Sequence, residues 1–201
     1  MVLDNLFSRR QKDREKWGTR LPPGQHVVEN WPVLSYGGTP RVEKKDWRLR
    51  VHGFVEKDVE FTWDEFQALP QTKVHCDIHC VTAWSRFDND FEGVLWSDLM
   101  QHVKPLPDAR AVIAHCYGGY TTNVLLKDLE QPDVMVAHKH NGSDLEAQHG
   151  GPARLLVPHL YFWKSAKWLR SIEFIPKDMP GFWEQYGYHL RGDPWKEERY
   201  S

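Results

Sequence analysis

The chain has 201 residues, 40% of them hydrophobic, and a formal net charge of -2 at pH 7. This length suits one domain with a single sizeable core and leaves too few residues for two full domains. The near-neutral charge lacks the electrostatic footprint of proteins that bind nucleic acid or an anionic membrane, so we expect a small-molecule partner and neither of these. Ten tryptophans suit a protein that encloses a large planar ligand, although they also suit ordinary core packing.

The N-terminal region, residues 1–29, is charged and turn-rich and is expected to form an arm over the domain. Arg9 and Arg10 resemble the beginning of a twin-arginine export signal, but the charged residues 11–16 follow where such a signal has an apolar segment. The three cysteines lack the spacing of a disulfide framework, which favours reduced thiols. The sequence has no apolar run of the roughly 18 residues that a membrane span needs. We therefore expect a cytoplasmic protein.

The alternation of apolar and polar residues over 47–52 predicts a strand with one buried face. A second, short strand is expected to end at Phe61. Thr62 and Glu65 have the spacing of a capping box, which predicts a helix that reaches about Leu69 before Pro70 stops it.

The alternation resumes at Lys73 and ends at His79, so Cys80 lies at the end of a strand, where a polar, aromatic loop is expected to begin. Ser97 is the predicted N-cap of a helix that continues to about His102. Further strands are expected at 111–115 and 134–137, with turns at 118–119 and 141–142. Residues 154–157 and 168–174 are expected to complete the set of short strands and helices. This mixture of short strands and helices predicts the α+β class.

A cluster of possible metal ligands surrounds Cys80, and it is formed by His75, Cys76 and His79. On a strand, however, His75 and Cys76 point to opposite faces, and a tetrahedral zinc site needs four convergent ligands. The order of these residues also differs from the Cys-x-x-Cys-His pattern of haem attachment. A zinc-binding module is therefore the less favoured interpretation, with Cys76 as a small buried hydrophobic residue.

A second pattern, at 149–154 and 164–167, has the composition of an anion-binding site. The glycines at 150 and 151 let the backbone approach a ligand closely, while Arg154 and Lys167 provide a planar fork and a point charge suited to phosphate. The competing interpretation is a turn that leads into a strand, with solvated basic side chains.

Five segments of the chain form a recognisable series. They are Asn-Trp-Pro-Val-Leu at 30–34, Cys-Val-Thr-Ala-Trp-Ser at 80–85, Gly-Gly-Tyr-Thr-Thr at 118–122, Gly-Gly-Pro-Ala-Arg at 150–154 and Trp-Lys-Ser-Ala-Lys-Trp at 163–168. Their order resembles the molybdopterin-binding domain of the sulfite oxidase superfamily. The chain is especially similar to small single-domain members related to the catalytic subunit of the bacterial methionine-sulfoxide reductase system. The resemblance covers about residues 30–176, which would form the oxidoreductase domain, and 177–201 would form an aromatic C-terminal segment packed on it.

The resemblance implies a sulfite oxidase-type fold of mixed β-sheets with short helices, and a mononuclear molybdenum centre with one molybdopterin. Cys80 matches the cysteine whose thiolate binds molybdenum in the family, and Asn30 matches an asparagine that contacts the pterin. Several residues match the family's later loops, which hold the pterin phosphate: His149, Arg154, Ser165, Ala166 and Lys167. His149 departs from relatives of the sulfoxide-reductase type, which carry Asn there.

The same resemblance implies oxygen-atom transfer, with sulfite or a sulfoxide or N-oxide as substrate. Arg86, which follows Cys80 closely, is a candidate catalytic residue that would bind an anion, and a plain surface charge is the equal alternative. The sequence shows no ligand set for haem or an iron–sulfur cluster, so a separate electron-transfer protein or small redox carrier is expected. The main alternative is a non-catalytic domain of the same fold that binds a protein through its Trp-rich surface.

Overall fold

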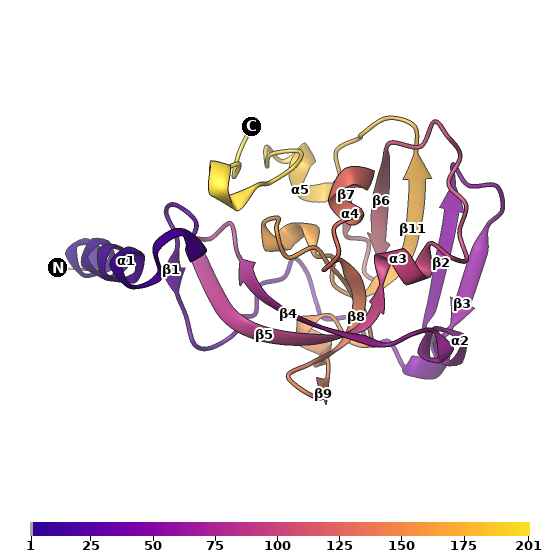
Figure 1. The fold of residues 1–201 in the computed structure, drawn as a ribbon, viewed down its shortest axis with the longest axis horizontal. Coiled ribbons are helices and arrows are strands. Elements are labelled where there is room, and N and C mark those ends of the chain that lie inside the picture. The colour runs from indigo at the N-terminus through magenta and orange to yellow at the C-terminus, as the bar shows by residue number, and fades with distance from the viewer. Residues whose placement is uncertain (1) are drawn as a thin grey trace.

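The structure is a computed structural model that describes residues 2–201, with side chains from residue 9 onwards; Met1, part of the expected N-terminal arm, lies outside the described residues. Within this range the strands form two sheets, one of six strands and one of five. Figure 1 shows the long strands β4 and β5 of the first sheet extending toward the N-terminal helix, while the second sheet stands at the opposite end. This mixture of sheets and short helices confirms the predicted α+β class.

The first sheet has the order β1-β5-β8-β10, with β4 paired to β5 and β9 paired to β8. Only the β1–β5 pair is parallel among these described strands. The strands are β1 (His26–Val27), β4 (Thr72–His79), β5 (Trp84–Leu95), β8 (Met135–His140), β9 (Ser143–Asp144) and β10 (Arg154–Leu156). The turn after β4 and the beginning of β10 therefore bring Cys80 and Arg154 to the same sheet.

The second sheet has the order β3-β2-β11-β6-β7. Its central strand β11 is parallel to β2 and antiparallel to β6. The strands are β2 (Arg48–Gly53), β3 (Val59–Thr62), β6 (Ala111–Cys116), β7 (Thr121–Leu125) and β11 (Leu169–Ile175). The sequence predicted β2, β3 and β6 close to these bounds, but it did not predict β7.

The helices of the described chain are α1 (Val2–Trp17), α2 (Trp63–Ala68), α3 (Trp96–Leu99), α4 (Leu126–Leu129) and α5 (Phe182–Gln185). Within residues 2–201, none of them combines the length and the apolar character that a membrane span requires.

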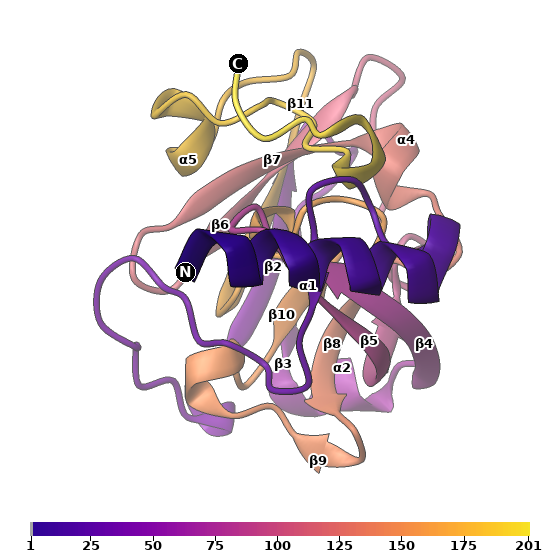
Figure 2. The same cartoon turned by 90° about the vertical axis from the view of Figure 1, so that its left-hand side faces the viewer.

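Helix α1 occupies the region where the sequence predicted a turn-rich arm. It is rich in Arg, Lys, Glu and Gln, which have high helix propensity, and Gly18, with φ of +54°, follows its end. The carboxylate of Asp13 accepts a hydrogen bond from the Val27 N–H at 2.8 Å, and Trp17 packs edge-on against Phe87. The helix thereby contacts β1 and β5, and it crosses the front of the molecule in Figure 2.

The capping box predicted for α2 is confirmed. The Glu65 N–H donates to Thr62 Oγ1 at 3.3 Å, and the Thr62 N–H donates to Glu65 Oε2 at 2.8 Å. The prediction for α3 was wrong in its bounds, because the helix begins at Trp96, ends at Leu99 and has no side-chain cap from Ser97. Trp96 and Leu99 are both buried, so core packing determines the position of this helix.

Strand β5 is the main element of the site region that the sequence did not predict. We expected a loop after Cys80, and the run Asp88, Asn89 and Asp90 indeed has low strand propensity. The strand forms nevertheless because it pairs with β4 on one side and β8 on the other, and because Phe87 and Phe91 are buried. The β4–β5 hairpin places Cys80 in its turn.

Three clusters of buried side chains support the sheets, and the smallest contains Ala111, Ile113 and Ile175. The other two matter for the position of the site. The larger cluster includes Trp47 and Phe66 and packs on the second sheet. The smaller one surrounds the β4–β5 turn and includes Cys80, Trp84 and Trp163. Cys80 therefore lies in mainly apolar surroundings.

The C-terminal segment, residues 177–201, lies along the top of the molecule in Figure 1. Arg191 forms an ion pair with the buried Asp128 of α4, with Nη2 and Oδ1 2.9 Å apart. The Tyr161 N–H donates to the Gly192 carbonyl at 2.7 Å. These contacts attach the C-terminal segment to the residues that precede β11.

Candidate active site

Cys80 lies in a tight turn between β4 and β5. Its N–H donates to the Trp84 carbonyl at 2.8 Å, and its carbonyl accepts from the Ala83 N–H at 3.0 Å. Ala83 adopts φ of +74°, a left-handed conformation that reverses the chain within the turn. The Cys80 Sγ lies 3.2 Å from Thr82 Oγ1. The thiol therefore has a fixed position rather than lying in a mobile loop.

The Cys80 thiol faces a cavity of about 290 Å³, which we call the Cys80 cavity. Its walls come from segments far apart in the sequence. The aromatic side chains that line it include Trp31, Trp84, Phe162, Trp163, Trp183 and Tyr188. Such wide rings with few polar groups between them are typical of a site for an organic ligand.

The surroundings of Cys80 determine its protonation. Burial raises the pKa of the Cys80 thiol, while hydrogen bonding from Thr82 and the charge of Arg199 oppose this shift. Since a metal binds the thiolate, a metal that binds here displaces the proton.

Arg154, at the beginning of β10, is completely buried yet also lines the Cys80 cavity. Its Nη1 donates to the His149 carbonyl at 2.7 Å, and its Nη2 donates to the Ser165 carbonyl at 2.5 Å. The Nε of Arg154 is buried and has no hydrogen-bond partner. Burial lowers the pKa of Arg154 to about 9, which leaves the guanidinium charged at neutral pH. An anionic group in the cavity would supply the missing partner.

Lys167 provides a second cation in the same wall. Its Nζ donates to the Leu34 carbonyl at 2.8 Å and to the Gln148 carbonyl at 3.0 Å. Burial, with a smaller contribution from Arg154, lowers the pKa of Lys167 to about 8. An anion beside Lys167 and Arg154 would relieve their mutual repulsion.

Gly150 allows the two loops of this wall to approach each other. Its φ is +109°, and a Cβ at this position would lie 3.1 Å from the Cα of Lys167. The Trp168 N–H donates to the Gly150 carbonyl at 3.2 Å. Gly150 thus permits a close contact between two loops of the chain, while the expected approach of the glycines to a ligand stays a prediction.

Ser165, Ala166 and His149 also line the Cys80 cavity. The Ser165 Oγ accepts from the Val157 N–H at 2.9 Å, so it serves partly to hold the loop. The His149 ring stacks on Trp31 with their centroids 4.0 Å apart, and burial and the charge of Arg154 lower the pKa of His149. The stacked ring is therefore neutral at pH 7.

Asn30 and Arg86 are the predicted site residues that the structure does not bring to this cavity. Asn30 is exposed, and the next residue, Trp31, lines the cavity instead. The Arg86 Nε donates to the Glu29 carbonyl at 3.1 Å, and its Nη1 donates to Asn89 Oδ1. Arg86 thus lies outside the lining and helps to hold the backbone two residues before Trp31.

Sequence reasoning missed the contribution of the C-terminal segment to the site. Trp183 and Tyr188 line the Cys80 cavity. The Arg199 guanidinium donates to the Val81 carbonyl at 2.5 Å, directly beside the cysteine. The aromatic composition of this segment was the available signal, but it does not reveal which surface the rings cover.

The structure does not support the zinc interpretation. Among the described residues, no group of three or more His, Cys, Asp and Glu side chains converges as it would around a metal ion. His75 is exposed and interacts with Asp90, while Cys76 is buried on the other face of β4. This finding concerns sites made of protein ligands alone. A metal that has one protein ligand needs no such group, because a cofactor supplies the other donor atoms.

Comparison with known proteins identifies several relatives. Residues 36–183 match the family described as "Oxidoreductase molybdopterin binding domain". The oxidoreductase YuiH of Bacillus subtilis is 44% identical over 183 residues, which cover 90% of this chain and 92% of YuiH. YedZ1 of Azospira oryzae, named as a protein-methionine-sulfoxide reductase subunit, is 28% identical over 85% of this chain and 66% of its own length. The NADH nitrate reductase of Ulva prolifera is also 28% identical, but the match spans 23% of that protein.

The fold is also found in a solved structure. The sulfane dehydrogenase SoxCD from Paracoccus pantotrophus superposes with a TM-score of 0.64 and 24% sequence identity, over 70% of this chain and 41% of that one. This likeness confirms the predicted sulfite oxidase-type fold.

The residues of the Cys80 cavity fit a molybdopterin cofactor. The Cys80 thiol provides a soft ligand for the metal, and the unpaired Arg154 Nε and the nearby Lys167 provide donors for a phosphate. The rings of Trp31 and Phe162, which lie against the Arg154 guanidinium, provide flat walls for a pterin. The thiol and the cations come from different loops but line one cavity.

Proposed function

Because the chain belongs to the oxidoreductase molybdopterin-binding domain family and is thus a molybdenum-dependent oxidoreductase of the sulfite oxidase type, we propose that it transfers an oxygen atom at a molybdenum ion bound by Cys80. The observation that carries this proposal is the Cys80 cavity, where one fixed thiol, the buried Arg154 and the half-buried Lys167 line the same space. Sulfite and a sulfoxide or N-oxide are the substrate classes that we propose.

The predicted site residues that line the cavity have three roles in this proposal. Cys80 ligates the metal, and Arg154 and Lys167 bind the pterin phosphate. His149, Ser165 and Ala166 shape the pterin-binding wall. When bound, the cofactor supplies the two-electron redox chemistry that accompanies oxygen-atom transfer.

The reaction requires an external electron partner. Reduction of a sulfoxide consumes two electrons and two protons and releases water, while oxidation of sulfite to sulfate takes an oxygen atom from water and releases two electrons and two protons. We propose that a separate electron-transfer protein or a small carrier exchanges these electrons, and the relative named as a reductase subunit supports such an arrangement. We also propose a cytoplasmic location, which the three free cysteines support.

Metal and pterin analysis tests the proposal. The protein, produced in a host that makes molybdopterin, is expected to contain nearly one molybdenum and one pterin per chain. Cys80→Ser should change or abolish the Mo(V) paramagnetic signal, whereas the control Cys76→Ser should keep it, since Cys76 lies outside the cavity. A folded protein without molybdenum, or an unchanged signal in Cys80→Ser, would refute the proposal.

The direction of the reaction requires a separate assay. Holoprotein is incubated with a sulfoxide or an N-oxide and reduced viologen, and in parallel with sulfite and ferricyanide. Turnover in either assay that disappears in Cys80→Ser supports oxygen-atom transfer. Loaded protein that is inactive in both would contradict it.

A further inference from the structure

The C-terminal segment forms part of the wall of the Cys80 cavity. Trp183 and Tyr188 stack on each other, with centroids 5.1 Å apart and an angle of 20° between the rings. Tyr188 also meets Trp163 edge-on at 5.1 Å. Both rings pack on the buried cluster that contains Cys80. Burial raises the pKa of Tyr188, and Tyr200 and Cys80 add to the shift, which agrees with a position near the thiol.

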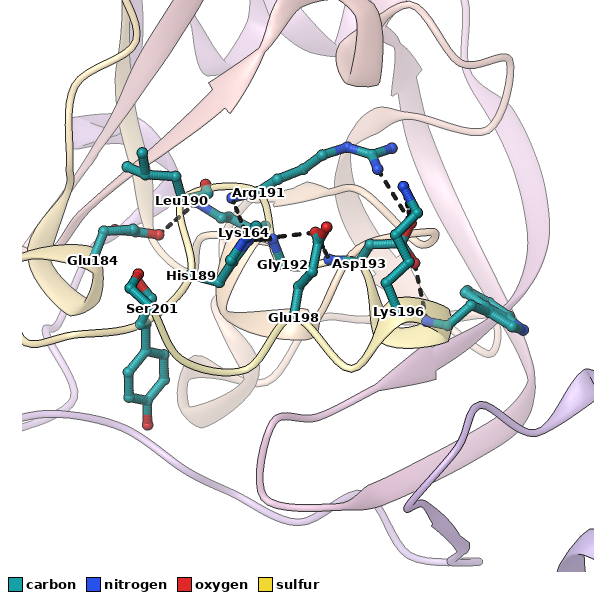
Figure 3. Close-up of polar contacts among 12 residues, drawn as sticks. Lys164, Glu184, His189, Leu190, Arg191, Gly192, Asp193, Lys196, Glu198 and Ser201 are labelled. Carbon is teal, nitrogen blue, oxygen red and sulfur yellow. Dashed lines mark hydrogen bonds and ion pairs between the residues drawn. The ribbon is translucent and has the colours of Figure 1, made fainter.

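A buried ion pair fixes this wall. Glu184 directly follows Trp183, and its Oε1 lies 2.5 Å from Lys164 Nζ, with both side chains almost completely buried. The same oxygen accepts from Trp163 Nε1 at 2.8 Å and from Thr122 Oγ1 at 2.9 Å. Lys164 also donates to the Leu190 carbonyl at 2.6 Å (Figure 3). Trp163 and Ser165, the two neighbours of Lys164 in the chain, line the cavity, so the ion pair holds Trp183 against this lining.

The charges of the lining restrict what this wall can bind. Among the described residues that line the Cys80 cavity, the Lys and Arg side chains are Arg154 and Lys167. Both donate to backbone carbonyls, and they are the proposed partners of the pterin phosphate. The nearby cation Arg199 donates to the carbonyls of Val81 and Pro23. The stacked rings of Trp183 and Tyr188 therefore present an apolar surface without a free cation, which favours an uncharged apolar group.

We propose that Trp183 and Tyr188 determine substrate specificity by binding an uncharged, apolar substituent next to the reacting atom of the substrate. This inference rests on the proposed function, because it assumes that the substrate reacts at Cys80. The Glu184–Lys164 pair positions the two rings and does not touch the substrate.

Paired ligands that differ only in an apolar group test the inference. Binding of methyl phenyl sulfone and dimethyl sulfone, which mimic sulfoxides but are not reduced, is measured on the holoprotein by calorimetry. The corresponding sulfoxides are compared by kcat/KM. We expect the phenyl compounds to bind better, and Trp183→Ala and Tyr188→Ala each to lower this preference by about tenfold.

Matched variants separate specificity from structure. Tyr186 is an exposed ring in the same segment and does not line the cavity, so Tyr186→Ala should keep the wild-type preference. Tyr188→Phe should also keep it, because the proposal depends on the ring and not on the hydroxyl. Molybdenum content and the Mo(V) signal should be unchanged in all of these variants.

The outcomes distinguish this inference from the proposed function. Equal affinities of the loaded holoprotein for the two sulfones would overturn the proposed role of Trp183 and Tyr188 in specificity. A preference for the phenyl compound that persists in both alanine variants would overturn it too. A preference for the phenyl sulfone that depends on Trp183 and Tyr188, found in a protein without molybdenum, would support the binding role of the two rings. The same result would refute the proposed function.

Discussion

At the scale of single residues, Arg154 combines complete burial with a donor that lacks a partner. Arg154→Ala should weaken cofactor binding by about 1.5–3 kcal/mol, because it removes a charge-assisted contact. Pterin and molybdenum content under limiting cofactor measures the effect. The control Arg170→Ala replaces an exposed arginine that lies outside the Cys80 cavity. Equal occupancy in the two variants would contradict the role of Arg154.

Glu184 and Lys164 form a pair whose members depend on each other. Burial lowers the pKa of Lys164, and the charge of Glu184 opposes this shift. Glu184→Ala leaves a buried cation without its partner and should lower the free energy of unfolding by about 3–5 kcal/mol. Urea unfolding measures this change. The double replacement Lys164→Met with Glu184→Met should recover part of the loss, and a purely additive double variant would show that the two charges are not coupled.

The lowered pKa of His140 predicts how the free energy of unfolding changes with pH. Burial, followed by the charge of Arg86, lowers the pKa of His140 to about 4, compared with an ordinary value of 6.5. In the unfolded chain His140 therefore binds a proton at a higher pH than it does in the folded protein. The free energy of unfolding keeps its full value above pH 6.5 and decreases as the pH falls toward 4. Between pH 7 and 5.5, the wild type should lose about 1 kcal/mol more unfolding free energy than His140→Gln. Equal losses of unfolding free energy in the wild type and in His140→Gln would show that other groups cause the pH dependence.

At the scale of elements, strands β5 and β8 approach each other closely at Gly93. A Cβ there would lie 2.1 Å from the Val136 carbonyl oxygen, so the two strands could pair only after moving apart. Gly93→Ala should lower the free energy of unfolding by about 1–3 kcal/mol, as in other overpacked positions. The control Gly38→Ala has no atom within 4 Å of the added methyl group and should change little. Similar denaturation midpoints for both variants would contradict this prediction.

Sequence patterns identified the elements with local signals and missed those that depend on distant pairing. The Thr62 and Glu65 cap and the alternation before Cys80 are local, and both led to correct elements. Strand β5 contains an Asp-Asn-Asp run and is stabilised by β4 and β8, which no local pattern contains. The same limit explains the site, where the loop resemblance indicated Arg154 and Lys167 but not Trp183.

At the scale of the whole molecule, one cavity joins the β4–β5 turn, the loops on either side of β10 and the C-terminal segment. The position of each wall follows from tertiary contacts, such as Lys167 with the Leu34 carbonyl across 133 residues of sequence. Composition predicted an aromatic, near-neutral protein for a small partner, but it could not predict which rings would face the cavity. The family resemblance identified Cys80 as the candidate metal ligand, and the structure identified the residues that surround it.

The Arg199 contact with the Val81 carbonyl has a consequence for the order of events during synthesis. The two residues are 118 positions apart, so the ribosome completes the Cys80 turn long before Arg199 emerges. A nascent chain thus passes through a stage in which the residues of the Cys80 turn have been synthesised but Trp183 and Tyr188 have not. Until these residues are made, the Cys80 cavity lacks the side that Trp183 and Tyr188 provide.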